Sequence, residues 1–142
     1  MDTFVMLEEL LELMRIDVSS GQETELADCL VKKLEQMGFS ITRDEAGATF
    51  GGVCGNILAV REGKREGVAC FCSHMDRVPG GIGIRPVEDN GILRSSGDTI
   101  LAADDLSGVA AILEGVRQAI ESGKALPKLE ILFTVGEEAG LY

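Results

Sequence analysis

The strongest constraint on the fold is a strand–helix–strand pattern in the second half of the chain. Two short apolar runs, at 68–73 and 129–135, flank a longer segment, 105–121, with helical periodicity. The apolar positions of that segment are Leu106, Val109, Leu113, Val116 and Ile120. Apolar runs of this length are typical of strands covered on both faces, so we predict two buried strands connected through a helix.

The rest of the sequence continues this alternation. Ser20 and Glu23 fit a capping box that opens a helix, and Gly38 fits its end. The other predicted elements are a helix at 3–17, strands at 39–43 and 56–60, and a hairpin at 87–93. Helices that alternate with strands favour an α/β domain whose central twisted sheet is mixed, mostly parallel and flanked by helices.

Composition and charge limit the possible partners. At 142 residues the chain is one domain or part of a larger one, and 45% hydrophobic residues suffice for a packed core. A net charge of -11 repels nucleic acids and anionic membranes, so neither is expected as a partner. The apolar segment 1–14 lacks a basic start and is interrupted by glutamates. We therefore predict neither a signal peptide nor a membrane span, and a cytoplasmic location.

The cysteines give no sign of a disulfide framework. The chain has four of them, Cys29, Cys54, Cys70 and Cys72, and they form no C-x-x-C pair. Cys70 and Cys72 lie two apart in a predicted strand, so they share one face and cannot easily bridge each other. We predict reduced, buried thiols.

The only histidine of the chain follows the first apolar run. His74 lies two residues before Asp76, and at a strand end this spacing points both side chains the same way. A carboxylate beside an imidazole can fix its tautomer and raise its basicity, as in metal sites. The pair alone is also compatible with an ordinary surface or core histidine.

Two acidic pairs lie in comparable places. Asp104 and Asp105 open the predicted helix, where one can cap free N–H groups while the other bridges two cations. Glu137 and Glu138 follow the second apolar run, and neighbours in an extended chain point to opposite sides. One glutamate can therefore bind a metal while the other accepts a proton from water. A helix cap and a solvated strand end are the purely structural alternatives. Together with the imidazole, however, these carboxylates predict a metal-dependent hydrolase site at the strand ends.

Three motifs in this order carry a family resemblance. The strings SHMDRVPGG, GDTILAADDLSGVAAILEGV and LEILFTVGEEAGLY resemble the N-terminal half of the catalytic domain of the di-zinc exopeptidases, in their peptidase T-like (tripeptide aminopeptidase-like) branch. The resemblance covers roughly the whole chain and is strongest over 68–142. It implies a zinc-exopeptidase-like fold and hydrolysis of the N-terminal bond of short peptides. It also implies two zinc ions per complete site, with cobalt or manganese as possible substitutes.

The resemblance also implies a role for each motif residue. His74 would bind one zinc ion, with Asp76 orienting its imidazole. Asp104 would bridge both metals and be followed by a cis peptide bond. Glu137 would be the general base and Glu138 a zinc ligand. The expected catalytic residues are thus Asp76 and Glu137, and the expected metal ligands are His74, Asp104 and Glu138.

The sequence departs from the family in two respects. Arg77 and Leu106-Ser107 stand where threonine and Lys-Ala are common. Arg77 would either bring a cation to the mouth of the site or pair with nearby acids. The family also supplies a later acidic ligand, a later histidine and an inserted dimerisation domain. Residues 1–142 are therefore expected to be the N-terminal part of a catalytic domain, nearly inactive alone, from a protein that forms a homodimer.

Other functions remain open at this point. Within the hydrolases, an acyl-amino-acid amidase or a carboxypeptidase relative fits the same motifs. Outside catalysis, the chain could be a metal-binding module or a subunit that lends half a site to a partner. A carboxylate base next to the ligands argues against a pure metal-storage role.

Overall fold

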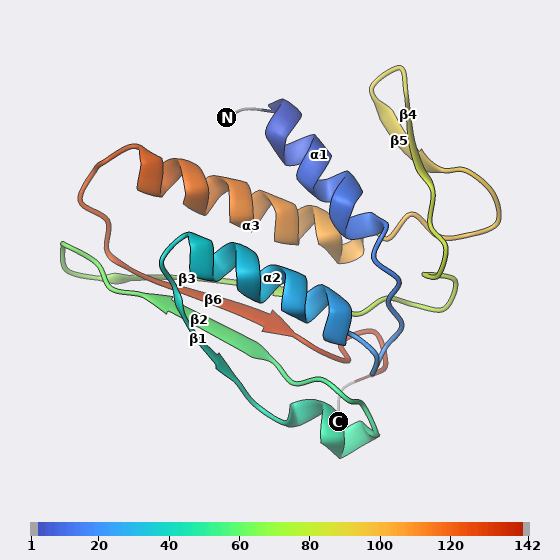
Figure 1. Ribbon diagram of the computed structural model, residues 1–142, viewed down its shortest axis with the longest axis horizontal. Coiled ribbons are helices and arrows are strands. Elements are labelled where there is room, and N and C mark those ends of the chain that lie inside the picture. Colours follow the sequence, from blue (N-terminus) through green and yellow to red (C-terminus); the bar gives the residue numbers. More distant parts are fainter. Residues whose placement is uncertain (1–2, 141–142) are drawn as a thin grey trace.

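The computed structural model describes residues 3–140, which form three α-helices, one short 3-10 helix and six strands (Figure 1). The helices are α1 (Thr3–Met14), α2 (Thr24–Gln36), η1 (Ala46–Phe50) and α3 (Ala103–Glu121). The strands are β1 (Ser40–Arg43), β2 (Ile57–Arg61), β3 (Val68–His74), β4 (Pro86–Asp89), β5 (Ile92–Ser95) and β6 (Lys128–Thr134). The predicted elements are confirmed, except that α1 ends at Met14 and that η1 was not foreseen.

The main sheet has the strand order β1-β2-β6-β3. β3 and β6 are parallel, because the chain between them crosses over through α3. The β1–β2 and β2–β6 pairs are antiparallel. The sheet is therefore mixed, as predicted, but only one of its three pairings is parallel. β4 and β5 form a separate hairpin.

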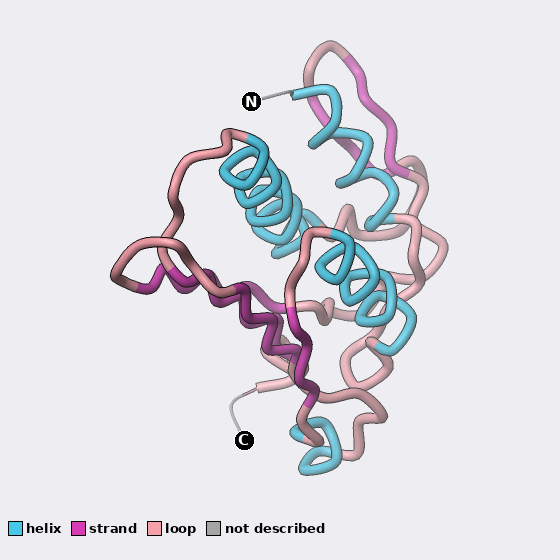
Figure 2. Tube along the Cα trace, turned by 60° about the vertical axis from the view of Figure 1, so that its left-hand side comes forward, coloured by secondary structure: helices cyan, strands magenta, loops and turns pink. Residues whose placement is uncertain are grey.

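The hydrophobic core lies between the sheet and the helices, which cover one face of the sheet (Figure 2). Alternate residues of β6, namely Leu129, Ile131 and Phe133, are buried on this face. Leu106 and Leu113 of α3 pack into the same cluster. Each fully buried aliphatic side chain contributes about 1.5–3 kcal/mol, so this layer holds β3, β6 and α3 in fixed relation.

β3 is more exposed than its apolar sequence predicted. It is an edge strand, and the described helices cover only one sheet face, so Val68 is 58% and Phe71 41% exposed. Cys70 and Cys72 are also exposed, whereas Cys54 is buried and Cys29 half-buried, all with free thiols. The predictions of a strand covered on both faces and of four buried thiols were therefore wrong, because a sequence pattern does not reveal which strand lies at the edge.

The predicted capping box is not formed. α2 begins at Thr24 without a side-chain cap at Glu23. The hydroxyl of Ser20 instead donates to Asp76, and the Glu23 carboxylate accepts the N–H of Gly21. Tertiary contacts therefore replaced the local hydrogen bonds that the sequence suggested. Within residues 3–140, no helix has the length and hydropathy needed to cross a bilayer.

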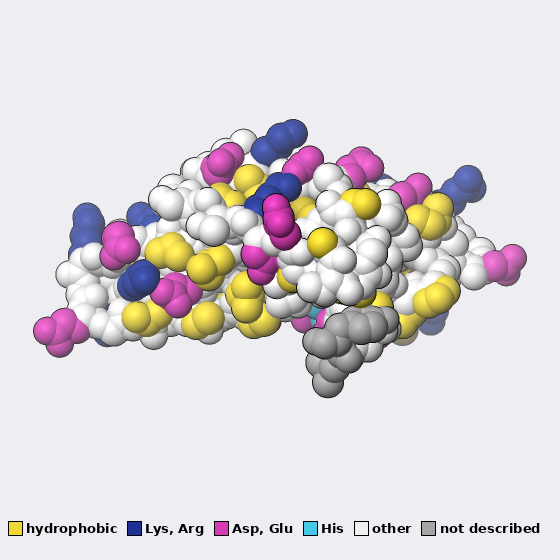
Figure 3. Space-filling model, turned by 90° about the horizontal axis from the view of Figure 1, so that it is seen from below, with side chains coloured by type: hydrophobic (Ala, Val, Ile, Leu, Met, Phe, Trp, Pro, Cys, Tyr) yellow, Lys and Arg dark blue, Asp and Glu magenta, His cyan; other side chains and the backbone are white. Residues whose placement is uncertain are grey.

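We expect the chain to self-associate through the open face and edge of β3, because unpaired strand edges and apolar patches favour association. Figure 3 shows that the surface carries several groups of hydrophobic side chains, which are the kind of patch that favours association. Val68→Lys should raise the dissociation constant about tenfold, since burying one valine is worth roughly 1.5 kcal/mol. Sedimentation velocity over a range of concentrations measures this. Ile92→Lys in β5 is the control, because Ile92 is 52% exposed but lies outside the main sheet. Equal association of both variants would contradict the prediction.

Candidate metal centre

The parallel pairing of β3 and β6 brings their carboxyl ends to one edge of the sheet. His74, the last residue of β3, lies opposite Thr134, the last residue of β6. The N–H of Met75 extends this pairing with a 2.8 Å hydrogen bond to the carbonyl of Thr134. Beyond Thr134, two residues lead to Glu137, so both polar motifs emerge side by side, as expected for strand ends in α/β sheets.

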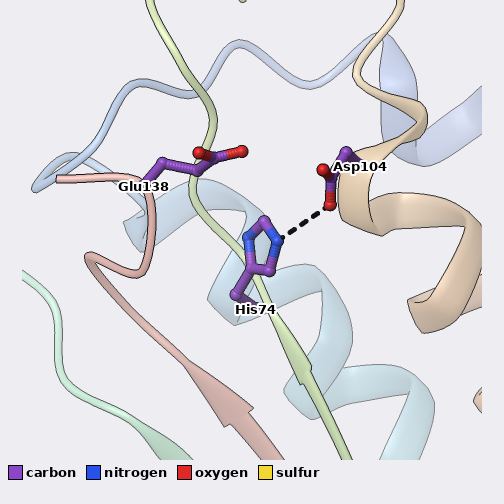
Figure 4. A group of neighbouring side chains, drawn as sticks. All are labelled: His74, Asp104 and Glu138. Carbon is purple, nitrogen blue, oxygen red and sulfur yellow. Dashed lines mark hydrogen bonds and ion pairs between the residues drawn. The ribbon is translucent and has the colours of Figure 1, made fainter. Parts of the chain in front are cut away.

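The three predicted metal ligands meet at this edge (Figure 4). Their ligand atoms, from His74, Asp104 and Glu138, all lie within 4.8 Å of one another. The Nε2 atom of His74 is 3.1 Å from Oδ1 of Asp104. One imidazole nitrogen and two carboxylate oxygens form a donor set that zinc accepts. The His74 side chain is 10% exposed and the Asp104 side chain 84% exposed, so the centre combines one buried ligand with one that has room to move.

Glu137 lies beside the same imidazole. Its Oε2 atom is 3.9 Å from Nε2 of His74, and its side chain is 56% exposed. The predicted base is therefore at the mouth of the ligand cluster, where it reaches both the cluster and solvent.

Asp76 joins the two motifs. Its Oδ1 atom lies 3.5 Å from Nδ1 of His74 and accepts the N–H of Glu137 at 2.9 Å. Its Oδ2 atom accepts the N–H of Glu138 at 3.0 Å and the hydroxyl of Ser20 at 2.7 Å. Because Asp76 is 1% exposed, this carboxylate depends on these protein donors. The sequence suggested only its contact with the histidine. Its hydrogen bonds with the backbone N–H groups of Glu137 and Glu138 are a finding of the structure.

The two aspartates at the start of α3, Asp104 and Asp105, have different roles. The Asp104–Asp105 peptide bond is cis, which confirms the implication of the resemblance. Asp105 accepts the N–H of Gly108 at 3.1 Å, so it caps the regular part of the helix. Ser73 donates to the Asp105 carboxylate at 2.7 Å and thereby ties α3 to the end of β3. Asp104 remains free to face His74.

Surrounding carboxylates control the charge of the histidine. Burial favours the neutral imidazole, but hydrogen bonds to Asp104 and to the Asp76 carbonyl, with the charges of Asp76 and Glu137, outweigh it. Together they raise the pKa of His74 above its ordinary value. A proton and a metal cation would therefore compete for the same negatively charged pocket of ligands.

Arg77 does not lie where the sequence placed it. It is 1% exposed, and its guanidinium donates to the carbonyls of Leu13, Ile16 and Gly81 at 2.9, 2.8 and 3.1 Å. Burial lowers its pKa to about 10, with the charge of Asp17 working in the opposite direction. The predicted cation at the mouth of the site was therefore wrong, and within residues 3–140 the acid whose charge acts on Arg77, Asp17, forms no ion pair with it. Arg77 instead hydrogen-bonds to backbone carbonyls at the end of α1 and in the loop that follows it.

Two serines near the centre were missed by sequence reasoning. Ser20 contacts Asp76 across 56 positions, and Ser73 contacts Asp105 across 32. Ser73 had a detectable signal, since it directly precedes His74 in the strand. Ser20 was assigned to a helix cap, and no local pattern could have revealed its distant partner.

Comparison with known proteins places this arrangement in a family. Residues 56–142 match the model of peptidase family M28. The YqjE protein of Bacillus subtilis (strain 168) is 37% identical over 137 residues, which are 96% of this chain and 37% of YqjE.

Solved structures agree over the same extent. Aminopeptidase PepT from Bacillus cereus ATCC 10987 is 34% identical, with a TM-score of 0.90 over 95% of this chain and 37% of that one. A tripeptidase from Staphylococcus aureus subsp. aureus Mu50 is 33% identical, with a TM-score of 0.89 and the same coverage of both chains. The chain thus spans little more than a third of the length of these relatives. The resemblance to peptidase T-like exopeptidases is confirmed, and the chain belongs to peptidase family M28.

Proposed function

We propose that this chain is the metal-binding N-terminal part of the catalytic domain of a peptide hydrolase that removes the N-terminal residue from short peptides. The observation that carries the proposal is that His74, Asp104 and Glu138 come together where β3 and β6 end and α3 begins. The names of the similar aminopeptidase and tripeptidase support the choice of substrate.

The ligand cluster would hold zinc, with cobalt or manganese as possible substitutes. His74 would hold one ion, Glu138 would hold a second, and Asp104 would be shared by both. Zinc in such a site supplies a Lewis acid that polarises a peptide carbonyl and acidifies water. The donor types fit zinc, and the exposed Asp104 and half-buried Glu138 can close the remaining distance.

Glu137 would move the proton. Its carboxylate lies at the open side of the cluster, where it can accept a proton from the attacking water and return it to the leaving amine. Asp76 keeps Glu137 in place through the backbone and keeps the His74 ring in its orientation. Glu137 would thus carry out the acid–base chemistry with an exposed side chain on a backbone that Asp76 holds in place.

We also propose that residues outside this chain supply further ligands and a dimerisation domain, because it covers 37% of the matched relatives. Alone, the chain would bind metal without appreciable peptide hydrolysis. A location in the cytoplasm remains a prediction.

A chimera tests the activity. In it, residues 1–142 replace the matching segment of the Bacillus cereus aminopeptidase, and hydrolysis of a tripeptide is measured with added zinc or cobalt. We expect Glu137→Gln to lower kcat roughly 10³-fold, because it removes the base and keeps the shape. Glu121→Gln, an exposed change in α3, is the matched control.

Three results would each contradict part of the proposal. A folded Glu137→Gln chimera with unchanged kcat would show that Glu137 is not the general base. Preference for an N-acetylated tripeptide over the free one would favour an acyl-amino-acid amidase. Hydrolysis by the isolated 142-residue chain, abolished by Glu137→Gln, would show that it needs no further ligands.

A further inference from the structure

We propose that Ser20, in the loop between α1 and α2, is a positioning residue for the metal centre. This inference rests on the proposed function. Ser20 would act through Asp76, which in turn fixes the backbone of Glu137 and Glu138. The loop that carries Ser20 lies far from both motifs in the sequence, so the contact depends on the tertiary fold.

The hydrogen bonds form a short chain from the loop to the ligands. The hydroxyl of Ser20 donates to Oδ2 of Asp76 at 2.7 Å. The same oxygen accepts the N–H of Glu138 at 3.0 Å, while Oδ1 accepts the N–H of Glu137 at 2.9 Å. Ser20 therefore shares one oxygen with the residue proposed to bind metal.

The hydroxyl of Ser20 is important as a donor because its acceptor, the Asp76 carboxylate, is buried. Asp76 is 1% exposed, so a lost donor is not freely replaced by bulk water. Without the Ser20 hydroxyl, the carboxylate can turn toward its other donors and carry the attached glutamate backbone with it. Loss of a group such as Asp76, which contacts the ligands, typically lowers metal affinity about 10–100-fold, and Ser20, one contact further out, is expected at the lower end of that range.

The loop itself is held in place from two sides. The Glu23 carboxylate is fully buried and accepts the N–H of Gly21 at 2.7 Å. The carbonyl of Gly21 accepts the N–H of Val53 at 2.9 Å. Gly21 has a φ of 83°, a conformation that other residues rarely adopt. These contacts fix the residue next to Ser20, so its hydroxyl is presented to Asp76 by an ordered turn.

A local role in helix capping does not account for Ser20. α2 begins only at Thr24, and its N-terminus has no side-chain hydrogen bond from the preceding residue. The second contact of the Ser20 hydroxyl, at 3.2 Å, is with the carbonyl of Arg77, directly after Asp76. Both contacts of this side chain are thus with the segment that leaves β3.

The test measures the zinc affinity of the 142-residue chain, with the exposed Cys70 and Cys72 changed to serine, by competition with a chromophoric chelator. Thermal unfolding of the metal-free chain is measured alongside. We expect Ser20→Ala to weaken zinc binding about tenfold, and Ser20→Thr to restore it by returning the hydroxyl. Ser19→Ala is the matched control, because Ser19 is the exposed neighbour in the same loop. Ser20→Val has the size of threonine without the hydroxyl and should bind zinc as weakly as Ser20→Ala.

The outcomes separate this inference from the proposed function. If the wild type binds zinc and Ser20→Ala binds it within about twofold, Ser20 is not a positioning residue and the proposed function stands. A lower unfolding temperature with unchanged affinity has the same meaning, since it shows a structural role only. If Ser20→Ala does not fold, equal affinities of Ser20→Val and Ser20→Thr overturn the inference. If the wild type binds no zinc, the proposed function fails first.

Discussion

Replacing His74 with alanine should lower the zinc affinity of the chain at least about 100-fold. The reason is that His74 supplies the only imidazole of the sequence and lies at the centre of the ligand cluster. It is also the least mobile ligand, because it is 9% exposed and held by Asp76 on its other nitrogen. Two carboxylates on more exposed side chains would remain, and these bind zinc weakly without a nitrogen partner. Isothermal titration with zinc measures the loss.

The design of this measurement must exclude other zinc donors. Cys70 and Cys72 are exposed on the same strand, and thiolates bind zinc strongly. Both are therefore changed to serine in every protein compared. Asp104→Asn should also weaken binding, whereas Asp98→Asn, an exposed aspartate in the loop before α3, should not. If His74→Ala binds zinc as tightly as its parent, the metal lies elsewhere and the candidate centre is wrong.

Replacing Arg77 with alanine should destabilise the fold by about 3 kcal/mol or more, because it leaves buried carbonyls without donors and opens a cavity. The carbonyls of Ile16 and Gly81 lose this donor, whereas that of Leu13 keeps the N–H of Ile16 at 3.2 Å. Such a loss would lower the midpoint of thermal unfolding by roughly 10 °C in a domain of this size. Differential scanning calorimetry and urea unfolding of the metal-free chain measure the change.

Two further variants sharpen this prediction. Arg77→Lys keeps the charge but cannot reach several carbonyls at once, so it should recover only part of the lost stability. Arg85→Ala removes an exposed arginine and should change stability by less than about 0.5 kcal/mol. A stability loss no larger for Arg77→Ala than for Arg85→Ala would show that the buried guanidinium adds little. The site would be affected as well, because Arg77 directly follows Asp76.

The elements of the fold could be read from local patterns. The apolar run at 129–135 predicted the strand β6, and helical spacing predicted α3 and its buried face. These patterns report which side of an element faces the core, and that depends only on neighbouring residues. They could not report strand order or coverage, so β3 was taken for a strand buried on both sides and proved to be an edge.

The sequence by itself determined that one imidazole, that of His74, and two acidic pairs follow strands or open a helix, and the family resemblance implied which acid of each pair is a metal ligand. His74, Asp104 and Glu138 each stand at the end of a strand or the start of a helix, and the parallel pairing of β3 and β6 brings such ends together. The tertiary structure alone decided what holds them there. Ser20 reaches Asp76 across 56 positions, and Arg77 meets carbonyls at the end of α1. Both contacts depend on which distant segments the packed layers bring within hydrogen-bonding distance, and local sequence patterns do not report that.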